Sequence, residues 1–151
     1  MPPAGTKQHR LEVIHPSPEE AHKMPYAPAV SIVGACDLMF VSGCTPSRLY
    51  HDHPHRDEEH IHPHSIEEQA KAAMECIKQI LDTVGAGFGD IVKVTKYLTD
   101  MRDADGVNRT MQSFMGDWRP ASTMVCINSL SSPGARVEID VVVALPRRNP
   151  A

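Results

Sequence analysis

The chain has 151 residues, of which 41% are hydrophobic and 23% charged, and its formal net charge is -4. This length predicts a single domain over residues 1–151 that buries its core without disulfides. No cluster of Lys and Arg is long enough to form a nucleic-acid footprint, and no window is apolar enough to span a bilayer, so neither nucleic acid nor a membrane is expected as a partner.

Cysteine usage and the N-terminus indicate the compartment. The four cysteines lie far apart with no CxxC spacing, which is typical of reduced thiols. Residues 1–7 contain no apolar segment of the kind a signal peptide needs. We therefore expect a cytoplasmic protein.

Three short strands are predicted in the first part of the chain, at 11–14, 30–33 and 38–41. The last two are separated by residues 34–37, a connection of hairpin length. Residues 1–10 are expected to be disordered and 16–28 irregular. Residues 44–64 form a polar loop that is rich in histidine.

The clearest helix is predicted to begin after Ser65. Ser65 and Glu68 form a capping-box pattern, in which each side chain bonds a backbone N–H of the other. Apolar residues then recur at steps of three and four, at Ile66, Ala70, Ala73, Ile77, Ile80, Leu81 and Val84. Gly85 suits a left-handed C-terminal cap.

The second half of the chain alternates strands with one more helix. Residues 90–98 predict a strand with Val92, Val94 and Leu98 on one face and the lysines directed outward. A second helix is expected over 103–116, and two adjacent final strands over 122–127 and 136–144. The fold class is α+β, with one mixed sheet of about six strands and two helices on one face.

Two carboxylates interrupt the last apolar strand. Glu138 and Asp140 must point to the face opposite Val137, Ile139 and Val141, because side chains alternate along a strand. Acidic residues are uncommon in strands. They form either a solvated outer face or a general acid/base group in a cleft.

Several local phrases together resemble the reactive-intermediate deaminase family, also called the YjgF or endoribonuclease L-PSP family. In order along residues 11–145 they are Pro25-Tyr-Ala-Pro28, Phe40-Val-Ser-Gly43, Glu68-Gln-Ala70, Gly89-Asp-Ile-Val-Lys93, Tyr97-Leu-Thr-Asp100, Val107-Asn108, Pro120-Ala121 and Val137-Glu-Ile139. The resemblance implies a chorismate-mutase-like fold and a homotrimer with small-molecule sites between subunits. It implies hydrolysis of enamines or imines without a cofactor.

The resemblance also assigns site residues. It implies that Glu138 positions or activates the attacking water. The residues implied to approach or orient the substrate are Tyr26, Ser42, Gly43, Asn108, Ser122 and Thr123. Cys44 follows Ser42 and Gly43 at a predicted strand end, so it is the cysteine to test for reactivity and a further candidate at the site.

One position departs from the family pattern. The family phrase Pro-Ala-Arg-Ser/Thr reads Pro120-Ala-Ser-Thr123 here, so Ser122 occupies the place of the arginine that binds the substrate carboxylate. A serine brings no charge, so ordinary 2-imino acid deamination is not expected. Arg48 is either a replacement that binds the carboxylate or a solvated charge of the loop. Arg119 is not a replacement, because its odd offset from Ser122 directs it to the other face.

The polar loop carries six histidines, at His51, His53, His55, His60, His62 and His64. Neutral imidazole is a common metal ligand. The spacing matches no defined catalytic zinc motif, so no metal site is assigned. A solvated loop with adventitious metal affinity and a true metal site both stay open.

The sequence leaves three possible functions open. The first is a hydrolase or deaminase of a reactive small molecule, with Glu138 handling the proton. The second is a trimeric protein that binds a small molecule without chemistry, which loss of the arginine favours. The third is metal sequestration or catalysis by the histidine loop.

Overall fold

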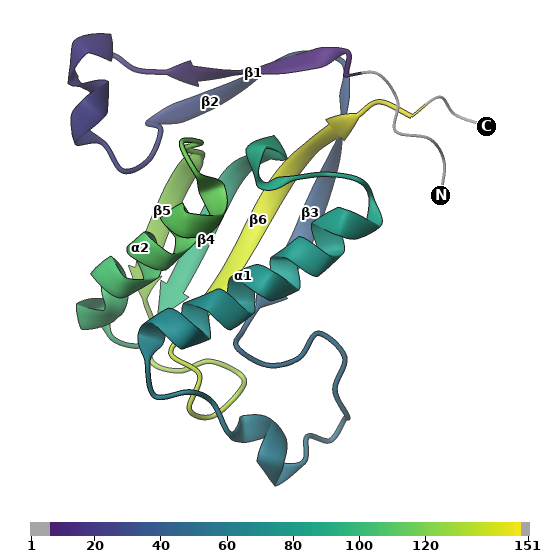
Figure 1. Cartoon of the computed structure of the whole chain (residues 1–151), viewed down its shortest axis with the longest axis vertical. Helices are drawn as coiled ribbons and strands as arrows, with labels where there is room; N and C mark the ends of the chain where they lie inside the picture. Colours follow the sequence, from purple (N-terminus) through teal and green to yellow (C-terminus); the bar gives the residue numbers. More distant parts are fainter. Residues whose placement is uncertain (1–6, 149–151) are drawn as a thin grey trace.

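The computed structural model describes residues 7–148. Within them the strands and helices are β1 (His9–Ile14), β2 (Ala29–Gly34), β3 (Cys36–Cys44), α1 (Ile66–Thr83), β4 (Ile91–Leu98), α2 (Ala104–Met115), β5 (Ala121–Cys126) and β6 (Val137–Pro146). Short 3-10 turns occupy Pro18–Lys23, Asp57–His60, Phe88–Asp90 and Met101–Asp103. The α+β class is confirmed, and both helices lie on one face of the main sheet (Figure 1).

The strands form two sheets. The main sheet has the order β3-β6-β4-β5, in which only β4 and β5 are parallel, and β1 pairs separately with β2. The prediction of one six-stranded sheet is therefore wrong. So is the expected disorder of residues 9 and 10, which belong to β1; residues 1–6 lie outside the described part.

Two pairs of strands that the sequence predicted to be adjacent are not adjacent in the sheets. The connection around residues 34–37 is no hairpin, because Gly34 at φ +103° redirects the chain between β2 and β3. A Cβ at Gly34 would lie 2.3 Å from the Gln8 carbonyl oxygen, so only glycine fits this turn. The final strands β5 and β6 are not adjacent either, because β4 lies between them. The α2 crossover places β5 parallel to β4, and β6 pairs with the other edge of β4.

Helix α1 packs its predicted apolar face on β3 and β6. Ile66, Ala70, Ala73, Ile77 and Leu81 are buried, whereas Ile80 is half-buried and Val84 exposed. The Ser65 hydroxyl accepts the Glu68 N–H at 3.3 Å, as predicted, and it also donates to the Glu67 carboxylate at 3.0 Å. Gly85 takes the expected left-handed conformation at φ +69°.

Strand β4 carries a lysine into the protein. Val94, Lys96 and Leu98 all face the helices and are buried, whereas Lys93 faces the other side of the sheet. The prediction that both lysines point outward is therefore wrong for Lys96. Side chains two residues apart on a strand share a face, so Lys96 lies on the same face as Val94 and Leu98. The apolar pattern of the sequence hid this placement.

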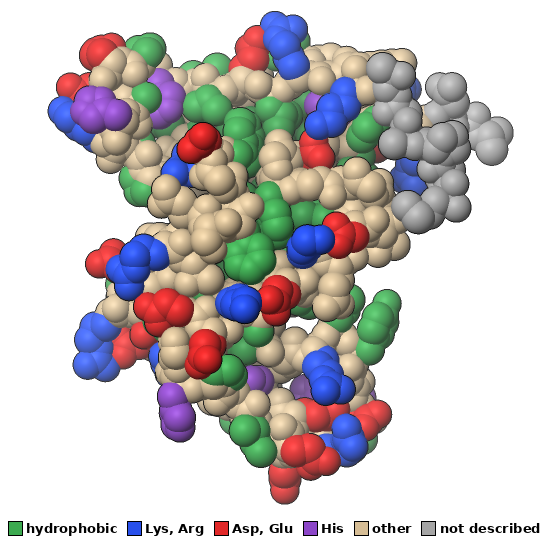
Figure 2. Space-filling model, viewed as in Figure 1, with side chains coloured by type: hydrophobic (Ala, Val, Ile, Leu, Met, Phe, Trp, Pro, Cys, Tyr) green, Lys and Arg blue, Asp and Glu red, His purple; other side chains and the backbone are tan. Residues whose placement is uncertain are grey.

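The helix side of the molecule mixes charges of both signs without a basic stripe (Figure 2). Among residues 7–148, no helix is both long and apolar enough to cross a bilayer.

Candidate functional site

A pocket of about 320 Å³ opens beside α2 and β5. Its lining residues are Pro25, Tyr26, Lys96, Asn108, Ser122 and Met124. A smaller hollow of about 60 Å³ adjoins it towards Trp118 and Arg119. The structure thus brings together three residues that the resemblance singled out, Tyr26, Asn108 and Ser122. The volume suits a small molecule.

Backbone pairing and helix packing position the side chains that line this pocket. Ala27 forms a parallel bridge to Ala121, and its N–H donates to the Pro120 carbonyl at 3.1 Å, which holds the neighbouring Tyr26 beside β5. Ser122 pairs with Val94 of β4 and therefore faces the helices as Val94 does. Asn108 comes from α2, which covers this part of the sheet.

Lys96 is the residue that sequence reasoning missed. It is only 8% exposed, and its Nζ donates to Asn108 Oδ1 at 2.9 Å. Burial, together with the nearby Lys93, lowers the pKa of Lys96 to about 8. Within residues 7–148 its ammonium has no carboxylate partner. A buried cation without a counterion favours an anionic ligand.

Arg119 also lines the hollow, contrary to the prediction from its offset. Strand β5 begins only at Ala121, so strand alternation does not extend back to Arg119. Its Nη1 donates to the carbonyl oxygens of Gly116 and Trp118, which ties the guanidinium to the end of α2.

A second group of predicted residues gathers around Glu138. Gly43 lies against this side chain so closely that a Cβ at Gly43 would be 1.8 Å from Glu138 Oε1. Burial, and secondarily the charge of Asp140, raises the pKa of Glu138. Both carboxylates face away from the helices, as predicted, because Ile139 between them is buried in the core. Glu138 and the pocket therefore lie on opposite faces of the sheet.

Cys44 is a poor candidate for reactivity. Its thiol is buried, and its pKa lies well above the ordinary value because the neighbouring Cys76 thiol and desolvation both disfavour the thiolate. Ser42, two residues earlier, is exposed, and its carbonyl accepts the Cys44 thiol at 3.7 Å.

Two further candidates lie elsewhere. Thr123 faces the side of the sheet opposite Ser122, and its hydroxyl accepts a hydrogen bond from Lys93. Arg48 is exposed and lines a separate cavity of about 490 Å³ with residues of the histidine loop, including His51 and His62. Neither residue joins Ser122 within one chain.

The six histidines divide into distinct roles. His51, His53 and His55 cluster, with one ring nitrogen of each lying within 4.8 Å of the others. His60 and His62 instead hydrogen-bond to the buried hydroxyl of Ser132, at 3.2 and 2.7 Å. His64 is exposed and is not part of the cluster among the described residues.

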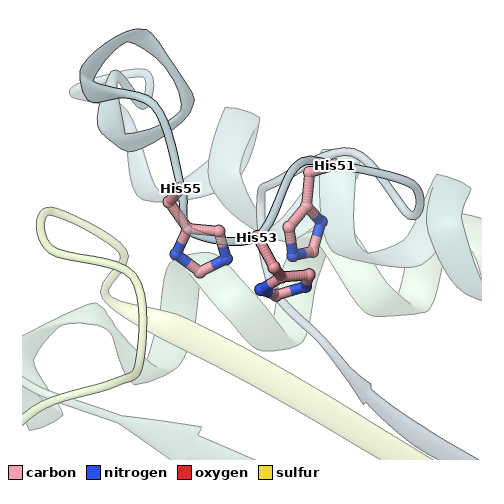
Figure 3. Close-up of side chains that lie close together, drawn as sticks. All are labelled: His51, His53 and His55. Atoms are coloured by element: carbon pink, nitrogen blue, oxygen red, sulfur yellow. The ribbon is translucent and has the colours of Figure 1, made fainter.

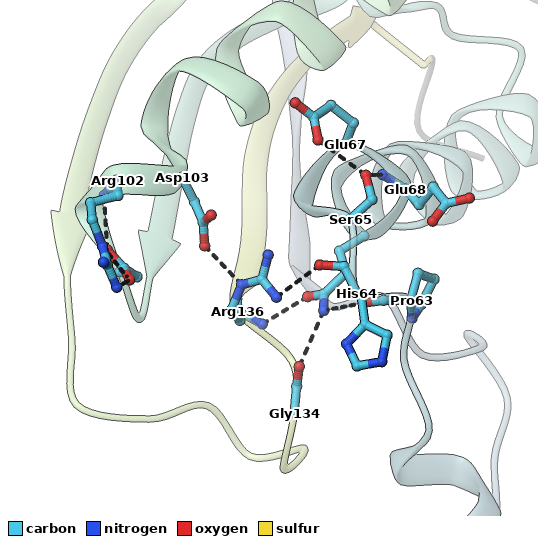
Figure 4. A network of polar contacts seen from close by, with 11 residues as sticks. Pro63, His64, Ser65, Glu67, Glu68, Arg102, Asp103, Gly134 and Arg136 are labelled. Carbon is cyan, nitrogen blue, oxygen red and sulfur yellow. Dashed lines mark hydrogen bonds and ion pairs between the residues drawn. The ribbon is translucent and has the colours of Figure 1, made fainter.

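The end of the histidine loop is tied to the fold by a polar network (Figure 4). Gln69 is fully buried, donates to the Pro63 and Gly134 carbonyls and accepts the Arg136 N–H. The Arg136 side chain donates to Asp103 at 2.8 Å and to the His64 carbonyl at 3.0 Å. These hydrogen bonds therefore hold the end of the histidine loop in place where it joins the start of α1.

Comparison with known proteins agrees with this arrangement. The sequence model of the family described as endoribonuclease L-PSP matches residues 19–145. The chain belongs to this family. A RutC family protein of Pyrococcus abyssi is 34% identical over 106 residues, covering 70% of this chain and 76% of that protein.

One further relative is named for an enzymatic activity, and two solved structures resemble this chain. Mouse 2-iminobutanoate/2-iminopropanoate deaminase is 32% identical over 80 residues, covering 53% of this chain and 58% of that protein. A solved structure from Thermotoga maritima is 31% identical with a TM-score of 0.61, covering 80% of this chain and 87% of its own. A YjgF-family structure from Mycobacterium tuberculosis, at 24% identity, covers 90% of this chain and all of its own with a TM-score of 0.58. The predicted chorismate-mutase-like fold is thereby confirmed.

Proposed function

We propose that this protein hydrolyses a small anionic imine or enamine to a carbonyl compound and ammonia. The observation that carries the proposal is the buried ammonium of Lys96 in the pocket formed with Tyr26, Asn108 and Ser122. Family membership and the imine deaminase activity named for the mouse relative support the reaction class.

Lys96 supplies the charge that Ser122 lacks. The two residues lie on adjacent strands, since Ser122 pairs with Val94 and Met124 pairs with Lys96. An ammonium binds a carboxylate as a point charge rather than as the two-pronged contact of a guanidinium. The substrate carboxylate would therefore be held by Lys96, with orientation from neighbouring polar groups. This revises the expectation that 2-imino acids have no anchor here.

Glu138 is the proposed base. Water attacks the electrophilic carbon of the C=N bond, and Glu138 accepts a proton from that water and returns it to the nitrogen. Glu138 then passes the proton of the new hydroxyl group to the amine nitrogen, the carbon–nitrogen bond breaks, ammonia leaves and a carbonyl forms. Its raised pKa places the Glu138 carboxyl nearer to neutral pH, where a general base and acid works best.

The proposal includes a homotrimer, because Glu138 and Lys96 lie on opposite sheet faces in one chain. A neighbouring copy that presents its Glu138 face to this pocket would complete the site. The same outer face carries the exposed side chains of Leu38 and Phe40 on β3, which is unusual for a face left in water.

The test is ammonia release from 2-iminopropionate generated in situ. We expect activity in the wild type, loss of turnover in Glu138→Gln, and a KM raised roughly 10- to 100-fold in Lys96→Met, because one charged contact contributes about 1.5–3 kcal/mol. Lys71→Met is the control, since Lys71 is an exposed lysine on α1 and does not line the pocket.

A second variant makes the test independent of folding defects. Ser122→Arg placed in the Lys96→Met background restores the positive charge from the adjacent strand, and we expect it to recover binding. Equal kinetics in wild type and Lys96→Met would contradict the role of Lys96. Wild-type turnover retained in Glu138→Gln would contradict the role of Glu138.

Binding without chemistry is the second candidate function. It is favoured by one observation, that the pocket within a single chain contains no carboxylate among its lining residues. In that case 2-iminopropionate analogues such as pyruvate would raise the melting temperature through Lys96, while ammonia release would stay at the uncatalysed rate.

A further inference from the structure

Three imidazoles of the histidine loop point toward one another (Figure 3). The ring centroids of His51, His53 and His55 are 4.7 to 4.8 Å apart, and one nitrogen from each ring lies within 4.8 Å of the other two. This triangle lies outside the Lys96 pocket and shares no residue with it. The proposed hydrolytic reaction makes no use of these three histidines.

The hydrogen bonding of His51 leaves a nitrogen free for a cation. Its Nδ1 lies 2.9 Å from the Arg48 carbonyl oxygen, which can only accept, so Nδ1 carries the proton. The Nε2 lone pair is then available. A metal-bound histidine commonly donates its other ring N–H to a carbonyl in this way, which fixes the ring orientation.

The charges of the loop favour a cation. Residues 44–64 contain four carboxylates and two arginines, a formal charge of -2 with neutral histidines. One of those arginines, Arg56, is already paired with Asp52 at 2.9 Å and with Glu58 and Glu59 at 3.6 Å.

The loop is held in place rather than free. Glu59 accepts the backbone N–H groups of Asp52 and Arg56, at 3.0 and 2.8 Å, and so closes the turn that carries His53 and His55, while His51 just before it is held by the Arg48 carbonyl. On the far side His60 and His62 hold Ser132. His60 also packs edge-on against His55, with ring centroids 5.2 Å apart. Among residues 7–148, the histidines whose ring nitrogens lie close enough together to share one ion are His51, His53 and His55.

We propose that His51, His53 and His55 form a binding site for a divalent first-row metal ion of the zinc type. Three neutral imidazoles with a fourth position open to water are a common zinc arrangement, with Zn–N distances of about 2.0–2.1 Å. The rings need only a small inward movement to reach it, since His53 is exposed and free to adjust. The site is separate from the imine chemistry and stands without it.

The experiment separates a built site from the general affinity of a histidine-rich tract. Untagged full-length protein is titrated with Co²⁺, followed by its visible absorption, and the Co²⁺ is then displaced with Zn²⁺. We expect one equivalent to bind with the spectrum of a four-coordinate ion. His53→Ala should weaken binding by about 100-fold, at the upper end of what loss of a supporting contact alone causes.

The matched control is His64→Ala. His64 belongs to the same tract, but its side chain is exposed and outside the cluster, and the Arg136 contact uses only its backbone carbonyl. We expect unchanged affinity in this variant. A tract that chelates without a defined site would lose affinity equally in both variants, and that result would overturn the proposal. So would the absence of stoichiometric binding in the wild type, with the fold checked by its thermal melt.

Discussion

At the scale of single residues, Lys96 stands out because it keeps a charge where the neighbouring positions of β4 are apolar. Val94 and Leu98 on the same face are fully buried in the core. Holding an ammonium there costs free energy, as the lowering of its pKa from 10.5 to about 8 indicates. A buried charge kept at such a cost is typical of a binding site rather than of a structural core.

This cost leads to a prediction about stability. Lys96→Met should raise the free energy of unfolding at pH 7 by roughly 1–2 kcal/mol, because an apolar side chain of similar length replaces a buried charge. The unfolded chain binds the Lys96 proton more tightly than the folded chain. Wild-type stability should therefore rise with pH between about 8 and 10.5, and this rise should be absent from the variant.

Chemical denaturation at pH 7 and at pH 9.5 measures both effects. Lys71→Met serves again as the control, with no comparable gain expected, because its charge is exposed to solvent. If Lys96→Met is instead destabilised at pH 7 and shows the same pH dependence as the wild type, the lysine contributes to the fold and not only to binding.

At the scale of elements, the close approach of β3 to β6 positions Glu138. The register between these strands shifts between Val41 and Cys44, and this irregularity brings Gly43 against the Glu138 carboxylate. Glycine is required here by the space and not by its backbone angles, because Gly43 does not have a positive φ. The strand pair thus fixes where the proposed base points.

Gly43→Ala should therefore separate activity from stability. The added Cβ would meet Oε1, Cδ and Cγ of Glu138, and this flexible side chain can turn aside, so we expect the free energy of unfolding to change by less than about 1 kcal/mol. The carboxylate must move, and turnover should fall at least 10-fold. Gly89→Ala is the control, because a Cβ there meets open space. Normal turnover in Gly43→Ala would show that the position of Glu138 is not critical.

At the scale of the whole molecule, the main sheet is covered by helices on one face only (Figure 1). The opposite face carries Glu138 and Asp140 together with Phe40, which is 74% exposed. Sheets of this kind normally bury an apolar outer face against another layer. The proposed trimer would supply that layer and would also unite the two halves of the site.

Phe40→Asp should consequently dissociate the trimer without unfolding the subunit. The side chain makes little contact within its own chain, so the loss should appear as a smaller mass in light scattering and as lost turnover. Tyr50→Asp is the control, an 89% exposed aromatic on the histidine loop. A wild type that is already monomeric would contradict the trimer, as would a Phe40→Asp variant of unchanged mass.

The sequence by itself determined the elements and the facing of several side chains. The period of α1, the cap at Ser65, the left-handed Gly85 and the outward direction of Glu138 all depend on residues within a few positions of each other, so local physics is sufficient. The family phrases, likewise local, identified the fold.

Only the tertiary structure decided which strands pair and which polar groups meet. The separation of β1 and β2 from the main sheet, the insertion of β4 between β5 and β6, and the contact of Lys96 with Asn108 join segments distant in sequence. The same holds for the division of six similar histidines into a triangle, a pair on Ser132 and one exposed ring. Strand periodicity gives two faces but not which one is covered, and that choice, made by the packing of α2, turned an apparent surface lysine into the centre of the pocket.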